Sequence, residues 1–184
     1  MKLKFLMTLT VCLLTPLPLA AQHAHTCNPT VLSNTPTHRF SVQPDGTAVD
    51  LRTGLTWMRC PLGYAIDDAG TPADYSDDAC VETGETTNMN WQAALETAAA
   101  LNDGGGFASF TDWRLPNIKE LVSIVERKCV WPALNTAVFP TVRFDKFWTS
   151  STYNNQTHAP HVEFIYGQND SSLKTSEWLV RLVR

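Results

Sequence analysis

The chain has 184 residues, of which 43% are hydrophobic, and a formal net charge of −4 at pH 7. This length suits a single domain with a sizeable core, and the acidic balance argues against nucleic acid as a partner. After residue 21, charged and polar residues interrupt every apolar run, so we expect no membrane span in the mature protein.

The first 21 residues have the pattern of a cleaved signal peptide. Lys2 and Lys4 provide a positive start, residues 5–19 are uncharged, and Leu19-Ala20-Ala21 offers small residues for cleavage. A retained membrane anchor is the alternative, but threonines and prolines leave the apolar run shorter than the roughly 20 residues that a spanning helix needs. We therefore expect a periplasmic or secreted protein whose net charge, without Lys2 and Lys4, is −6.

Residues 22–39 are polar and irregular, and they predict an N-terminal extension that becomes ordered near Cys27. Short β-strands are predicted next, at 40–42, 47–51 and 55–58, with turns at 44–46 and 52–54. We expect these strands to form an antiparallel meander and place the start of the folded domain, 40–184, at the first of them.

Four cysteines, Cys27, Cys60, Cys80 and Cys129, remain if Cys12 leaves with the signal peptide rather than serving as a lipidation site. An even number in an exported chain predicts two disulfides. A zinc site is the alternative, but no two of these cysteines have the close spacing of a zinc knuckle. Three pairings are possible. Because Cys60 and Cys80 bracket one local segment, we favour that pair, which leaves Cys27 with Cys129.

An acidic insertion lies at about 61–86. It contains seven Asp and Glu residues and no Lys or Arg. Clustered carboxylates can bind calcium, but these lack the ordered spacing of a calcium loop. We interpret the insertion as solvated, and the sequence as a whole predicts no metal and no cofactor.

Two helices are predicted after the insertion. Apolar residues recur at helical spacing from Trp91 to Leu101, after a possible cap at Asn88 or Asn90, and glycines 104–106 end the pattern. A capping box at Asn117 starts a second helix that we expect to end near residue 128. Between the two helices, we interpret Asp112 and Arg114 as an ion pair around a buried Trp113.

The C-terminal third predicts further strands at 147–148, 162–166 and 178–183, which are rich in aromatic and β-branched residues. Strands, then two helices, then strands are typical of an α+β fold with antiparallel pairing. We expect the two helices to pack on these short strands.

Residues 149–161 crowd hydrogen-bonding side chains into what we interpret as a loop. Tyr together with Ser and Asn is the composition of binding loops, although an ordinary solvated loop fits equally well. We predict a ligand-binding surface for a glycan or a protein partner, made of Tyr153, Asn154, Asn155, His158, His161 and Glu163. No nucleophile elbow, metal-binding helix or cofactor loop is recognisable, so we predict no catalysis.

Five blocks of the sequence resemble the Lcl C-terminal domain family, named for the terminal domain of a bacterial collagen-like adhesin. They are 45–47 with 53–57, Trp91 with Ala94-Leu95, 112–121, 147–151 and 180–184. The resemblance implies an exported, C-type-lectin-like α+β domain with a variable loop surface and no catalytic residues.

The resemblance also bears on partners and on the alternative functions. The adhesin's domain is associated with trimers, so a homo-oligomer is possible here, and with sulfated glycans, which the acidic charge of this chain disfavours. A structural or assembly role in the bacterial envelope is the alternative function. The related formylglycine-generating enzymes suggest a third function, which would require reactive cysteines.

Overall fold

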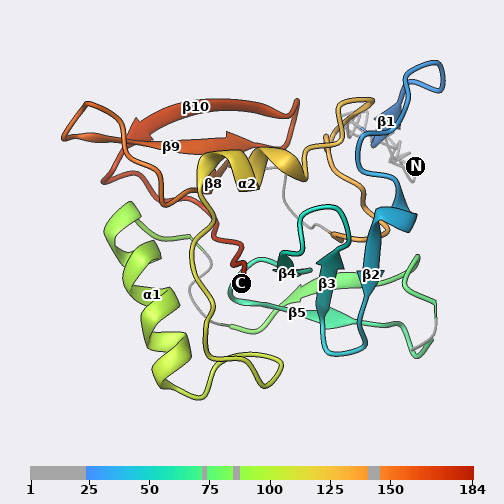
Figure 1. Cartoon of the computed structure of the whole chain (residues 1–184), viewed down its shortest axis with the longest axis horizontal. Coiled ribbons are helices and arrows are strands. Elements are labelled where there is room, and N and C mark those ends of the chain that lie inside the picture. The colour runs from blue at the N-terminus through green and yellow to red at the C-terminus, as the bar shows by residue number, and fades with distance from the viewer. Residues whose placement is uncertain (1–23, 72–73, 85–87, 141–145) are drawn as a thin grey trace, which may run out of the picture.

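The computed structural model describes residues 24–71, 74–84, 88–140 and 146–184. The predicted signal peptide, 1–21, lies outside the described residues. In the described ranges the chain forms two α-helices, one 3₁₀ helix and four small antiparallel sheets, which confirms the predicted α+β class (Figure 1). No helix within these ranges combines the length and the hydropathy that crossing a bilayer requires.

Three of the four sheets contain strands from residues 26–82. Strands β2 (Phe40–Val42), β3 (Thr47–Asp50) and β4 (Thr56–Met58) form the predicted meander. Asp45 shapes its first turn, since its Oδ1 accepts a hydrogen bond from the Thr47 amide at 3.0 Å while Gly46 adopts a φ of +83°. The other two sheets pair β1 (Thr26–Cys27) with β7 (Cys129–Val130), and β5 (Tyr64–Asp67) with β6 (Ala79–Glu82).

Both α-helices begin where the sequence predicts. In α1 (Trp91–Asp103) the Asn90 side chain accepts a hydrogen bond from the Ala93 amide at 2.9 Å. In α2 (Ile118–Ser123) the predicted capping box between Asn117 and Glu120 is present. The predicted end of α2 near residue 128 was wrong.

The backbone after α2 pairs with a distant segment instead of continuing the helix. Val125 forms a β-bridge with Leu134, and the Glu126 amide donates a hydrogen bond to the Ala133 carbonyl at 3.0 Å. This pairing explains why the helix ends early even though its local sequence would allow more turns.

The last sheet has the order β10-β9-β8 and differs from the prediction. Strand β8 (Lys146–Trp148) is where we expected it, but β9 (His158–Glu163) begins inside the predicted loop, and residues 164–166 belong to a turn. The polar strand β10 (Gln168–Leu173) was not predicted, because it is an edge strand with few buried side chains. The segment 178–183 forms isolated bridges with Met89, Trp57, Arg114 and Phe147 rather than a sheet strand.

The core forms around this C-terminal segment. Leu179, Val180, Leu182 and Val183 are at most 1% exposed, and the C-terminus lies near the centre of the view in Figure 1. Two hydrophobic clusters meet here. One contains Trp57, α2 residues and β9 residues, and the other contains Trp113, Trp148 and the buried face of α1, which confirms the packing of the helices against strands.

Ion pairs near the C-terminus correct one prediction. Asp112 and Arg114 do not pair with each other: the Arg184 Nε lies 2.6 Å from Asp112, and Arg114 makes two bonds of 2.8 Å with Glu120. Each of the two side chains therefore has a different partner, and Trp113 between them is buried as predicted.

Both predicted disulfides, Cys27–Cys129 and Cys60–Cys80, are present. The described part of the N-terminal extension is bound tightly to the domain. The Glu126 carboxylate accepts hydrogen bonds from the hydroxyl of Ser33 and from the amide and the hydroxyl of Thr35, and Thr35 is fully buried. Residues 33–39 therefore contribute to the packed structure.

Candidate functional site

Four of the six predicted ligand-binding residues come together. Tyr153, Asn154, Asn155 and His158, with Ser171 from β10, line a shallow hollow of about 310 Å³ that we call the loop hollow. Tyr153 is 50% exposed and offers an aromatic face to a ligand. Ser171 was missed because its strand was missed.

Short-range hydrogen bonds fix the side chains of the loop hollow. The Asn155 Oδ1 accepts bonds from the amide and the hydroxyl of Thr157, at 2.9 and 2.8 Å. The same hydroxyl lies 2.8 Å from the His158 Nδ1. These bonds occupy one polar atom of Asn155 and one of His158, while the Asn155 amide group has no partner among the described residues. The hollow can thus supply hydrogen bonds without first reordering its side chains.

A second hollow adjoins the first. Asn90, Trp91, Gln92, Lys174 and Thr175 line about 420 Å³ at the start of α1. The Lys174 amide donates to the Thr157 carbonyl at 2.8 Å, and the Lys174 carbonyl accepts from the Trp91 amide at 3.0 Å. These two bonds join Lys174 to the loop before β9 and to the start of α1. The Lys174 Nζ lies 4.4 Å from the centre of the Trp91 ring, so that aromatic face is already occupied by a cation.

The structure places His161 and Glu163 away from the loop hollow. His161 is only 2% exposed, and its ring lies 6.2 Å from that of Trp148 and 6.4 Å from that of Trp178. Burial, together with the positive charge of Lys146, lowers the pKa of His161 to about 4, against the opposing effect of Asp170. Glu163 lies at the other end of β9, opposite Lys146.

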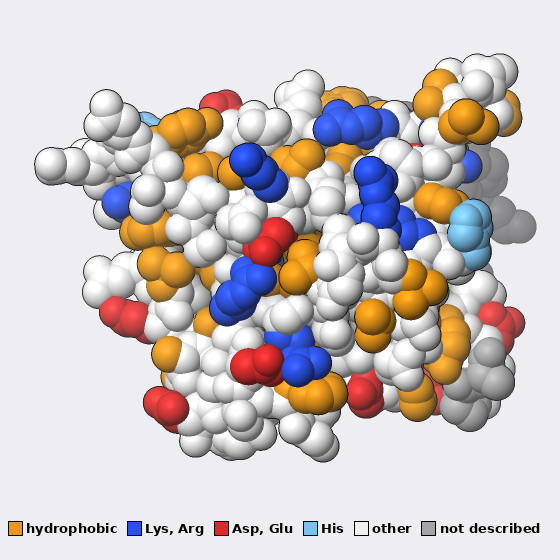
Figure 2. All heavy atoms as spheres, viewed as in Figure 1, with side chains coloured by type: hydrophobic (Ala, Val, Ile, Leu, Met, Phe, Trp, Pro, Cys, Tyr) orange, Lys and Arg blue, Asp and Glu red, His pale blue; other side chains and the backbone are white. Residues whose placement is uncertain are grey.

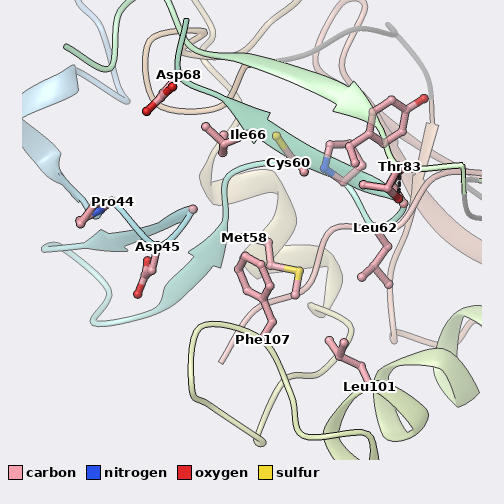
Figure 3. Close-up of a pocket in the computed structure, with 15 residues that line it drawn as sticks. Pro44, Asp45, Met58, Cys60, Leu62, Ile66, Asp68, Thr83, Leu101 and Phe107 are labelled. Atoms are coloured by element: carbon pink, nitrogen blue, oxygen red, sulfur yellow. Dashed lines mark hydrogen bonds between the residues drawn. The ribbon is translucent and has the colours of Figure 1, made fainter. Parts of the chain in front are cut away.

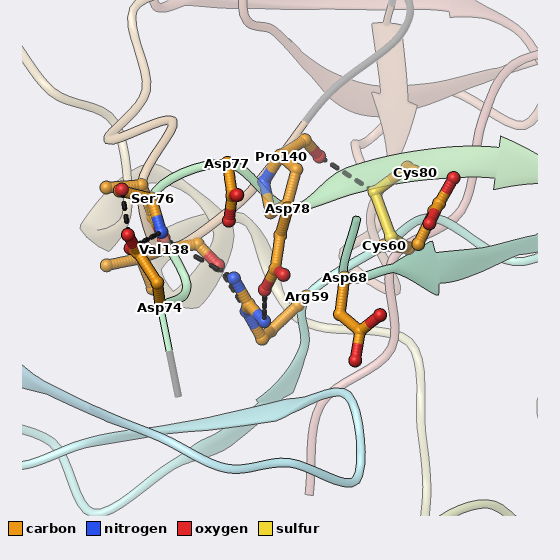
Figure 4. A network of polar contacts seen from close by, with 12 residues as sticks. Arg59, Cys60, Asp68, Asp74, Ser76, Asp77, Asp78, Cys80, Val138 and Pro140 are labelled. Atoms are coloured by element: carbon orange, nitrogen blue, oxygen red, sulfur yellow. Dashed lines mark hydrogen bonds and ion pairs between the residues drawn. A yellow bond between two sulfur atoms is a disulfide. The ribbon is translucent and has the colours of Figure 1, made fainter. Parts of the chain in front are cut away.

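The acidic insertion contains structure that the sequence did not reveal. The β5–β6 hairpin forms within it, and Asp78 pairs with Arg59, both side chains being 1% exposed. Arg59 also donates to the Val138 carbonyl at 2.9 Å (Figure 4). Its guanidinium lies 5.3 Å from the Tyr75 ring centre. The interpretation of the whole insertion as solvated was therefore wrong at Asp78, whose charge is buried because Arg59 neutralises it.

Other carboxylates of the insertion bond to their own turns. Asp74 accepts from the amide and the hydroxyl of Ser76 (Figure 4), and Asp77 accepts from the Thr71 hydroxyl. In the described ranges, the potential metal ligands that come together are His25, Cys27 and Cys129. The two sulfurs of that group are joined in a disulfide.

A cleft separates the β5–β6 hairpin from the end of α1. It has a volume of about 510 Å³ and is lined mainly by apolar side chains, among them Met58, Leu62, Ile66, Leu101 and Phe107 (Figure 3). We call it the hairpin cleft. Sequence reasoning missed it, because its walls come from separate stretches between residues 44 and 107 that are brought together only by the fold and by the Cys60–Cys80 disulfide.

These features define a disulfide-bonded α+β domain, of a kind consistent with an extracytoplasmic location, with polar hollows on one side and an apolar cleft. Residues 46–184 match the family of the Lcl C-terminal domain, and the chain belongs to that family. The resemblance read from the five sequence blocks is thereby confirmed. No curated protein matches the chain.

Proposed function

We propose that this protein is an exported, non-catalytic binding domain that recognises a glycan or a protein at the cell surface or in the envelope through the loop hollow. A glycan is the partner that the geometry favours. The observation that carries the proposal is the grouping of Tyr153, Asn154, Asn155 and His158 around one exposed hollow, with polar atoms fixed in place. An exposed aromatic face beside fixed amide groups suits a ring that carries hydroxyls.

The location follows from two features. Disulfides form and persist in oxidising compartments, and both disulfides of this chain join segments of one folded domain. Together with the sequence pattern of residues 1–21, they support a periplasmic or secreted protein. The face in Figure 2 shows Lys and Arg side chains across its middle, with Asp and Glu side chains next to some of them. The prediction that nucleic acid is not a partner rests on the net negative charge of the chain.

The absence of catalysis is part of the proposal. An enzyme of the formylglycine-generating type would need reduced thiols, whereas Cys27, Cys60, Cys80 and Cys129 are all paired. Thiol titration of the unreduced, denatured protein tests this point. Free thiols at two of these positions would favour the enzyme.

A glycan array tests the main proposal. The mature protein is compared with a Tyr153→Ala, Asn155→Ala variant and with a Tyr166→Ala control, since Tyr166 is equally exposed, at 53%, but lies outside the loop hollow. We expect glycans that bind the mature protein to bind the control and to lose affinity for the double variant. Equal binding by all three proteins would exclude the loop hollow as the glycan site.

A structural or assembly role in the envelope is the second candidate. It is favoured by Leu32, which is 93% exposed next to a half-exposed Val31 in a segment anchored to the domain. Exposed apolar side chains of this kind can mark a protein contact. Co-purification from the periplasm tests the role: a stoichiometric partner that a Leu32→Ser variant loses, together with a blank glycan array, would favour assembly.

A further inference from the structure

The hairpin cleft lies where the two hydrophobic clusters of the core meet. Cys60, Tyr64 and Ile66 belong to one cluster, and Met58 and Phe107 belong to the other. Met58, Cys60 and Tyr64 are at most 9% exposed and form a buried floor. The side chains of the two clusters do not fill the space between them and leave a cleft of about 510 Å³. This volume is within the usual range for small-molecule sites of roughly 300–1,000 Å³.

The walls of the cleft are held in place from several directions. The Phe107 ring packs so closely on Gly46 that an added Cβ at Gly46 would lie 3.2 Å from it. Leu101 is fixed by helix α1, and the hairpin is fixed by the Cys60–Cys80 disulfide. The cleft is therefore preformed, which reduces the entropic cost of binding.

The charged side chains of the lining are two carboxylates, Asp45 and Asp68, and among the described residues no Lys, Arg or His lines the cleft. In Figure 3 both carboxylates lie on the side of Pro44, whereas Leu62 and Leu101 lie on the opposite side. Each carboxylate uses Oδ1 to accept from a backbone amide two residues ahead, at 3.0 Å, and neither belongs to an ion pair in the described part of the chain. Two negative charges thus lie on one side of the cleft, and neither is neutralised by an ion pair in the described part of the chain.

We propose that the hairpin cleft binds a small organic cation with an aromatic or branched aliphatic body. The apolar walls would take the body, and Asp45 and Asp68 would take the charged amine at the rim. The same two charges disfavour an anionic ligand. The cleft and the loop hollow share no lining residue, so this proposal stands apart from the proposed recognition of a glycan.

Three probes that differ in charge test the proposal on the mature protein with both disulfides formed. They are naphthylmethylammonium, naphthylmethanol and naphthoate, and binding is followed by shifts of the backbone amide signals in NMR spectra. We expect the ammonium probe to bind about tenfold more tightly than the alcohol, because two partly exposed ion pairs each add a modest gain. The naphthoate should bind most weakly, and the shifts should occur at Leu62, Ile66 and Phe107 rather than at Tyr153 and His158.

A pair of matched variants separates the cleft carboxylates from the general acidity of the insertion. The Asp45→Asn, Asp68→Asn variant keeps the oxygen that each turn needs and should remove the tenfold preference for the ammonium probe. The Asp67→Asn, Asp74→Asn control changes two acids of similar turns outside the lining and should keep that preference. Equal affinity for the ammonium and the alcohol in the unmodified protein would overturn the proposal, as would shifts confined to the loop hollow or no binding of any probe.

Discussion

Lowering the pH from 7 to 5 should destabilise this protein through His161. The pKa of the buried imidazole is lowered from 6.5 to about 4, first by burial and then by Lys146. Between these two values the unfolded chain binds a proton at His161 and the folded chain does not. Stability must therefore fall as the pH falls through this window, and it is fully present above about pH 6.5.

The size of the effect follows from the two pKa values. The full shift of about 2.5 units corresponds to about 3 kcal/mol, of which about 2 kcal/mol should be lost between pH 7 and pH 5. Carboxylates act at lower pH. The pKa of Glu126 is lowered because hydrogen bonds from Ser33 and Thr35 outweigh its burial, so its contribution is lost only as the pH falls below its usual value.

Urea unfolding at pH 7 and at pH 5 measures the loss, with a His161→Phe variant as the control. Phenylalanine keeps an aromatic ring next to Trp148 and Trp178. The buried Nδ1 of His161 has no hydrogen-bond partner among the described residues, so the substitution leaves no such partner unsatisfied. His25, whose pKa burial also lowers, remains in both proteins. The variant should lose about 2 kcal/mol less than the parent. The same pH dependence in both proteins would refute the reasoning.

Three further predictions concern stability. Asp78→Ala should cost about 3–5 kcal/mol in urea unfolding, because it leaves the Arg59 charge buried without its partner, and an Arg59→Met change in the same chain should recover part of that loss. Replacing Cys60 and Cys80 by serine should cost about 3 kcal/mol in the same assay, given a loop of 20 residues, and no loss would show that the hairpin is held by packing alone. Glu126→Gln should speed amide hydrogen exchange of residues 34–35 by about tenfold, since it weakens the charged bonds that hold them, whereas the amides of α1 should not change.

The features that the sequence predicted correctly depend on local contacts. A helix start such as Asn117 needs only residues within one turn, and the turn at Gly46 needs only Asp45 and Thr47. The disulfide pairing was within reach because Cys60 and Cys80 bracket one short segment. Hydrophobic periodicity and turn-forming hydrogen bonds involve only a few neighbouring residues, and these elements depend on such local signals.

The features that it missed depend on partners far along the chain. Helix α2 ends early because Val125 meets Leu134, and Asp78 is buried because it meets Arg59. Strand β10 has no apolar pattern, so its presence follows only from pairing with β9. The hairpin cleft is the extreme case, because separate stretches between residues 44 and 107 form it, and no short window of sequence contains its pattern.

Whether a side chain bonds to nearby or to distant residues along the chain decides how mutations at the two candidate sites can be interpreted. Buried charges bridge distant segments, as Arg39 does by pairing with Asp50 and donating to the Ser123 carbonyl at 3.1 Å. The side chains of Asn155, His158, Asp45 and Asp68 bond instead to residues at most two positions away. Removing a side chain of the second kind breaks no contact between elements, so its stability cost should be within about 0.5 kcal/mol. A loss of binding in those variants would therefore report on the ligand contact itself, since the fold that presents the site depends on other residues.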